Sequence, residues 1–124
     1  MENLNQLSPL ALAFMGDAIH TAYVRKCVLM GQKNKLNNYH ETAKKFCNAH
    51  HQKEVFEKLL PVLSEEEQDV VRRARNCHSK HTAKNFDEET YKKATAFEAL
   101  IGFLYLSQNT QRLDEILKIS VNME

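Results

Sequence analysis

Asp17 and Glu98 are each the central acid of an otherwise apolar stretch of this 124-residue chain. Asp17 lies in LALAFMGDAIHTAYVR, residues 10–25, and Glu98 lies in TYKKATAFEALIGFLYL, residues 90–106. An ionised carboxylate in apolar surroundings is costly unless a cation compensates it. If the two stretches pack together, both acids could ligate one divalent cation, and Mg²⁺ prefers such oxygen ligands. The alternative is that each acid is a structural group paired with an arginine or with hydroxyls.

Both stretches have the pattern of an α-helix that is apolar nearly all round. Such a helix is buried, either in the core or against a second subunit. Small residues stand beside both acids: Gly16 next to Asp17 in sequence, and Gly102 on the helix face of Glu98. These glycines would leave room for the close approach of backbone, metal or substrate.

The segment VVRRARNCHSKHTAKN, residues 70–85, concentrates positive charge at a predicted helix end and in the loop after it. Its candidate RNA-binding residues are Arg72, Arg73, Arg75, Asn76, Ser79, Lys80, Lys84 and Asn85. Cations neutralise phosphates, while amides and hydroxyls bond phosphate and ribose oxygens, as the recognition of duplex RNA by its shape requires. The alternative is a solvated helix terminus whose cations complement the helix dipole. Together with a carboxylate pair that binds metal, the segment indicates phosphodiester hydrolysis.

The elements that must position these groups are predicted to be helices. Ser8 and Pro9 begin a first helix that ends at Gly31. Asn38 and Glu41 form a capping-box-like start of a second helix, whose apolar stripe resumes at Val55 and ends at Pro61.

The second half of the chain continues the helical pattern. Ser64 and Glu67 form a capping box, and about fourteen residues without apolar periodicity follow Arg75. A long helix begins at Thr90, and a final amphipathic helix places Leu113, Ile116 and Leu117 inward. No alternating strand pattern is present. We therefore expect an all-α fold and a single domain over residues 1–124.

Composition and cysteine usage favour a cytoplasmic protein. The net charge is +1 and 43% of the residues are hydrophobic, so no global basicity indicates a nucleic-acid partner. The three cysteines are an odd number without CxxC spacing, which favours reduced thiols. No secretory signal is visible, and the apolar run before residue 23 is too short to span a membrane. The Cys and His residues lack the paired spacing of structural zinc sites. His20 is either a metal ligand or a histidine satisfied by a neighbour.

Several motifs together resemble one enzyme family. FMGDA, residues 14–18, resembles the signature helix of the ribonuclease III catalytic domain, and AFEALIG, residues 96–102, resembles its second acidic motif. The chain is most similar to the short Mini-III group, which has no appended domain for binding double-stranded RNA. YVR at 23–25, the basic run at 72–79 and AKN at 83–85 match that group as well. The resemblance covers essentially the whole chain.

This resemblance implies an endoribonuclease that cuts double-stranded RNA and leaves 5′-phosphate ends. Asp17 and Glu98 would be the catalytic acids that bind Mg²⁺, in a homodimer with the first helix at the interface. The expected substrate is the precursor of 23S ribosomal RNA, with a large-subunit ribosomal protein as a candidate partner. Longer family members carry two further acids where this chain has Ala13 and Thr95, which argues against a fully liganded two-metal site.

Two other functions are compatible with parts of the sequence. Some ribonuclease III-like domains have lost catalysis and only bind RNA in ribosomal assemblies, although the retained Asp17 and Glu98 argue against this. A metal-dependent nucleotide hydrolase would explain the two acids but not the basic segment.

Overall fold

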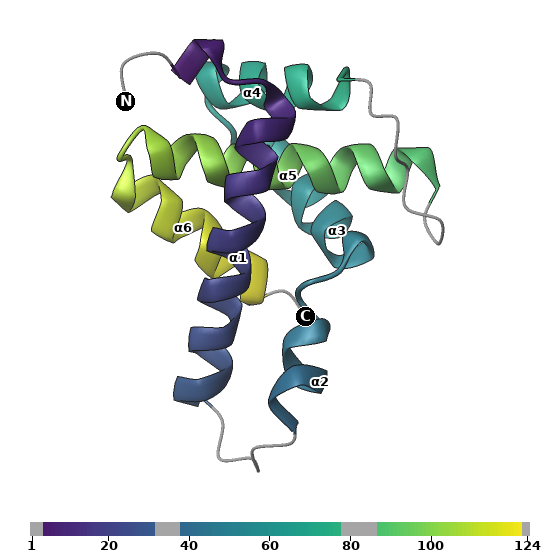
Figure 1. The fold of residues 1–124 in the computed structure, drawn as a ribbon, viewed down its shortest axis with the longest axis vertical. Coiled ribbons are helices and arrows are strands. Elements are labelled where there is room, and N and C mark those ends of the chain that lie inside the picture. The colour runs from purple at the N-terminus through teal and green to yellow at the C-terminus, as the bar shows by residue number, and fades with distance from the viewer. Residues whose placement is uncertain (1–3, 32–37, 78–86, 123–124) are drawn as a thin grey trace.

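The computed structural model of the chain describes residues 4–31, 38–77 and 87–122 (Figure 1). This part contains six α-helices: α1 (Pro9–Gly31), α2 (Tyr39–Lys44), α3 (Ala49–Leu59), α4 (Glu65–Arg75), α5 (Glu88–Leu106) and α6 (Thr110–Val121). Two short 3-10 helices, η1 (Leu4–Gln6) and η3 (Leu60–Val62), accompany them, and no strand occurs in the described residues. The predicted all-α fold is confirmed. None of the described helices is long and apolar enough to cross a membrane.

Helix α5 is the centre of the fold. It packs against α1, α3, α4 and α6, and α1 crosses it in Figure 1. From Ala94 to Leu104 every residue of α5 is buried except Glu98, which is partly exposed. A helix can be apolar all round only if neighbours cover every face, and here four helices do so. The single acid in this buried run therefore lies where the covering helices leave an opening.

Helix α1 is covered on one side only, so of the two predicted ways of burying it, the core of this chain accounts for one face. Leu12, Val24 and Val28 are buried, whereas Phe14 is 81% exposed and Met30 is 80% exposed. The reason is that the other helices of this chain pack against one face of α1. The opposite face keeps large apolar side chains in solvent, as a surface that contacts another molecule would.

The starts of α1 and α4 agree with their sequence signals. The Ser8 Oγ accepts a hydrogen bond from the Ala11 amide at 3.1 Å, as expected of the residue before Pro9. Ser64 and Glu67 form a complete capping box: the Ser64 amide donates to Glu67 Oε1 at 2.9 Å, and the Glu67 amide donates to Ser64 Oγ at 3.2 Å.

The region between residues 38 and 60 differs from the prediction. Asn38 makes no side-chain capping bond, so the capping box predicted with Glu41 is absent. The expected single helix is divided, because the Asn48 Oδ1 accepts from the His51 amide at 2.9 Å and begins α3. Asparagine is a strong N-cap residue, but the apolar stripe continues on both sides of Asn48 and so predicts one uninterrupted helix. Helix α5 likewise begins earlier than Thr90, because Asp87 caps it at 2.7 Å.

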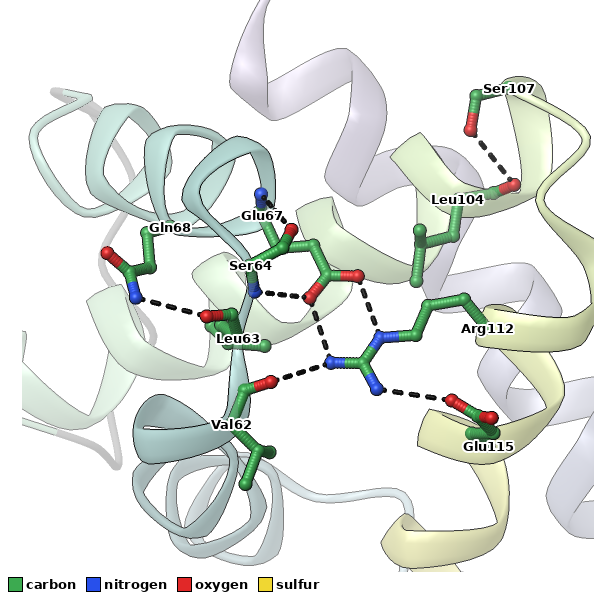
Figure 2. Close-up of polar contacts among 9 residues, drawn as sticks. All are labelled: Val62, Leu63, Ser64, Glu67, Gln68, Leu104, Ser107, Arg112 and Glu115. Carbon is green, nitrogen blue, oxygen red and sulfur yellow. Dashed lines mark hydrogen bonds and ion pairs between the residues drawn. The ribbon is translucent and has the colours of Figure 1, made fainter.

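A buried ion pair fixes α6 to the start of α4 (Figure 2). The Arg112 Nε donates to Glu67 Oε2 at 2.8 Å, and its Nη2 donates to Glu67 Oε1 at 2.9 Å and to the Val62 carbonyl at 2.9 Å. Glu67 is 4% exposed, and the Arg112 guanidinium holds the pKa of its carboxyl below the usual value. The Glu67 carboxylate also accepts from the Ser64 amide in the capping box. Arg112 therefore holds the start of α4, the helix whose last turn begins the basic segment.

We expect Arg112→Ala to destabilise the protein by about 2–4 kcal/mol, because it leaves the buried Glu67 carboxylate unpaired. Urea unfolding measures this change. The exposed Lys118–Asp114 pair on the same helix is a matched control, and Lys118→Ala should cost less than about 0.5 kcal/mol. Equal effects of the two substitutions would contradict a structural role for the Arg112–Glu67 pair.

Candidate active site

Helices α1 and α5 cross at two glycines with their backbones in contact. A Cβ on Gly16 would lie 1.7 Å from the Glu98 carbonyl oxygen, and a Cβ on Gly102 would lie 1.9 Å from the Leu12 carbonyl oxygen. No side chain larger than hydrogen fits at either position. Of the uses predicted for these glycines, the close approach of backbone is confirmed.

The glycine crossing brings the carboxyls of Asp17 and Glu98 into hydrogen-bonding contact. Burial raises the pKa of Glu98 to about 9, and the hydrogen bond and negative charge of Asp17 add to the shift. Without a cation Glu98 therefore keeps its proton at neutral pH, because a second carboxylate beside Asp17 would be repelled by its charge. Asp17 itself is exposed, so the expectation that its carboxylate is buried is wrong; Glu98 is the more buried member.

The donor set at this pair is suited to a hard cation. Both side chains supply oxygen, and a divalent ion could replace the proton of Glu98. Within residues 4–31, 38–77 and 87–122, no group of three or more His, Cys, Asp or Glu side chains is arranged to hold a metal. Ala13 and Thr95, where longer relatives are expected to carry acids, are both buried. The described residues therefore fit an ion held by two carboxylates and mainly by water.

Comparison with known proteins places this chain in a family. Residues 10–109 match the Ribonuclease III domain. The chain belongs to the ribonuclease III family. Family membership supports ribonuclease activity, and members generally use a divalent metal.

Individual ribonuclease III relatives match nearly the whole chain. A Mini-ribonuclease 3 from Thermoanaerobacter sp. (strain X514) is 41% identical over 98% of this chain and 86% of the relative. One from Brevibacillus brevis (strain 47) is 45% identical over 92% of this chain and 85% of the relative. The crystal structure of protein FN1578 from Fusobacterium nucleatum has a TM-score of 0.86 at 30% identity, covering 98% of this chain and 97% of that one. The predicted resemblance to the Mini-III group is thus confirmed.

Sequence reasoning missed three residues around the acid pair of this ribonuclease III domain. Gln52 on α3 is 6% exposed and donates a side-chain hydrogen bond to Glu98. The Cys47 thiol bonds the Thr21 side chain, and burial, with a further contribution from Asp17, raises its pKa. The sequence could have indicated Gln52, because it is a polar amide on the same helix face as the buried Val55, Phe56 and Leu59.

His20 is a buried core histidine in the described structure. It is fully buried, and its ring meets the Phe97 ring edge-on with centroids 5.0 Å apart. Burial, followed by the nearby His51, lowers its pKa to about 4, so the ring is neutral at pH 7. Of the two sequence interpretations, its Nδ1 contact with Gln52 at 3.4 Å fits a histidine bonded by a neighbour, while its buried Nε2 has no hydrogen-bond partner in the described part of the chain.

The basic segment is described only in part, because Ser79, Lys80, Lys84 and Asn85 lie outside the described residues. The last turn of α4 holds the three arginines, and Asn76 is its exposed C-cap residue.

The three arginines differ in how far they are engaged within the chain. The Arg72 side chain is 65% exposed and pairs with Asp69, whereas Arg73 is half-buried beside the same acid. Arg75 pairs with Glu89 at 2.9 Å and lies over the Phe56 ring, so it also joins α4 to α5 and α3. Arg72 is therefore the most accessible of the three for a phosphate.

The cysteines form no disulfide, since Cys27, Cys47 and Cys77 are all free. The reduced thiols predicted from their odd number and spacing are consistent with this finding.

The raised pKa of Glu98 makes stability depend on pH when metal is chelated. A carboxyl whose folded-state pKa is about 9 and whose ordinary value is 4.5 contributes stability below pH 4.5 that is lost as pH rises toward 9. His20, with a pKa of about 4 in the fold and 6.5 ordinarily, titrates below pH 7 and acts in the opposite direction. We therefore expect wild-type stability in EDTA to fall by about 2 kcal/mol between pH 7 and 9.

Glu98→Gln should remove most of that slope and be more stable than the wild type at pH 8 in EDTA. Urea unfolding at several pH values measures both effects. If the wild type and Glu98→Gln show the same slope between pH 7 and 9, the raised pKa of Glu98 is refuted.

Proposed function

We propose that this protein is a Mg²⁺-dependent endoribonuclease that cleaves double-stranded RNA and leaves 5′-phosphate ends. The observation that carries the proposal is the contact between Asp17 and Glu98 at the helix crossing of a ribonuclease III domain. The two carboxylates would hold the metal. When bound, Mg²⁺ supplies Lewis-acid stabilisation of the charge that builds up on the phosphate.

The chain's own groups have separate tasks in this proposal. Glu98 would release its proton when the acid pair takes up the cation, which couples metal binding to pH. The exposed Arg72 and the remainder of the basic segment bind phosphate and ribose oxygens, which hold the duplex across the acid pair.

The active form is proposed to be a homodimer that uses the uncovered face of α1. Phe14, Leu29 and Met30 are large apolar side chains with most of their surface exposed. A two-fold interface would bury these side chains against their copies or against a facing patch. Each subunit would then contribute one acid pair, one for each strand of the duplex.

We infer that the biological substrate is the precursor of 23S ribosomal RNA, matured in the cytoplasm and with a large-subunit ribosomal protein as a candidate partner. The Mini-ribonuclease 3 relatives and the full-length similarity support this inference. A cleavage assay on a ribosomal precursor stem, with and without Mg²⁺, tests it. Nucleoside triphosphates serve as the competing substrate, and their hydrolysis in place of RNA cleavage would refute the proposal.

The basic segment yields a separate prediction about RNA binding. We expect Arg72→Ala to weaken binding of a duplex RNA and to lower the slope of log affinity against log salt by about one. Fluorescence anisotropy at several salt concentrations measures this in an Asp17→Asn background, which leaves the RNA uncut. Lys84→Ala should act similarly, whereas Lys118→Ala on α6 is the control. An unchanged salt slope for both segment variants would assign these cations to the solvated helix end.

A further inference from the structure

Gln52 joins the three helices that surround the acid pair. It lies on α3, its side chain is almost fully buried, and its Nε2 is 3.4 Å from the His20 Nδ1 on α1. The same side chain donates a hydrogen bond to Glu98 on α5. A primary amide has two N–H groups, so it can donate to a ring nitrogen and to a carboxylate at once.

The contact with Glu98 determines which way the Gln52 amide faces. A carboxylate can only accept hydrogen bonds, so the amide nitrogen, and not its oxygen, lies on the side of Glu98. The same nitrogen is 3.4 Å from the His20 Nδ1, which therefore acts as the acceptor in this arrangement. The buried His20 ring, with Phe97 against it, thus takes the second N–H of the amide. A flipped amide would direct a carbonyl oxygen at the carboxylate and repel it.

We propose that Gln52 is a positioning residue that orients the Glu98 carboxylate for divalent metal binding, and that His20 accepts the second N–H of its amide. This deepens the proposed function and rests on it. Residues that hydrogen-bond to the ligands of a metal typically contribute ten- to a hundredfold to metal affinity or activity. Gln52 has the burial and the two partners that such a role requires.

The test is Gln52→Met, which keeps the size and shape of the side chain but removes both N–H donors. Calorimetric titration with Mn²⁺ in the absence of RNA measures metal affinity, and steady-state cleavage of a duplex RNA separates kcat from KM. We expect at least about tenfold weaker Mn²⁺ binding and a similar loss in kcat, with the KM for RNA unchanged. Gln52→Leu is the second variant if Gln52→Met does not fold.

Ser120→Ala is the matched control, because Ser120 is fully buried and its hydroxyl donates only to the Leu117 carbonyl on the same helix. It should leave Mn²⁺ affinity and kcat unchanged. Wild-type Mn²⁺ affinity in Gln52→Met would overturn the proposal, even if stability or kcat falls. Asp17→Asn tests the underlying function separately: if it binds Mn²⁺ and cleaves RNA normally, the acid pair is not the site at all.

Discussion

Asp17→Asn and Glu98→Gln should each reduce cleavage of double-stranded RNA in Mg²⁺ by about a thousandfold or more, since a bound metal supplies several kcal/mol of transition-state stabilisation. Each substitution keeps the shape of the side chain and removes the negative charge that a cation needs. Single-turnover cleavage of a labelled duplex measures the loss, and sedimentation shows whether the variants keep the assembly state of the wild type.

Asp114→Asn is the matched control, because Asp114 is an exposed acid on α6 whose ion-pair partner is Lys118. It should cleave RNA at the wild-type rate. Full activity in either Asp17→Asn or Glu98→Gln would refute the assignment of the acid pair. A wild-type protein that binds duplex RNA but never cuts it with Mg²⁺ or Mn²⁺ would favour the catalytically silent RNA-binding function.

Gly102→Ala should cause a large loss of stability. Its Cβ would lie 1.9 Å from the Leu12 carbonyl oxygen, and backbone cannot move aside as a flexible side chain can. We expect a cost of roughly 3 kcal/mol or more, because α1 and α5 must separate along the whole crossing. The separation also moves Asp17 away from Glu98, so cleavage should fall even at temperatures where the variant stays folded.

Gly31→Ala is the control for this prediction, because a Cβ at Gly31 would meet nothing within 4 Å. Alanine is the better helix former by about 1 kcal/mol in a helix interior, so Gly31→Ala at the end of α1 should be neutral or slightly stabilising. Urea unfolding compares the two variants. A Gly102→Ala protein as stable as Gly31→Ala would show that the backbones do not touch at the crossing.

Most of the helices could be predicted from the sequence because their signals are local. Ser8 with Pro9 and Ser64 with Glu67 satisfy the first amides of their own helices, and each bond spans three residues. The predicted helix across residues 38–60 was wrong for a related reason. An apolar stripe continues through Asn48, and periodicity alone does not show that a capping side chain divides it.

The sequence by itself determined the all-helical fold, the family resemblance and the two acids that stand in apolar helices. These depend on residue types and on spacings within one helix. Only the tertiary structure decided that the two acids are in contact, that Asp17 is the exposed member, and that Gln52 and His20 support Glu98. These contacts join residues far apart in the chain. The two acids meet because Gly16 and Gly102 let α1 and α5 approach until their backbones touch, and the sequence could indicate small residues there but not that these two helices cross at them.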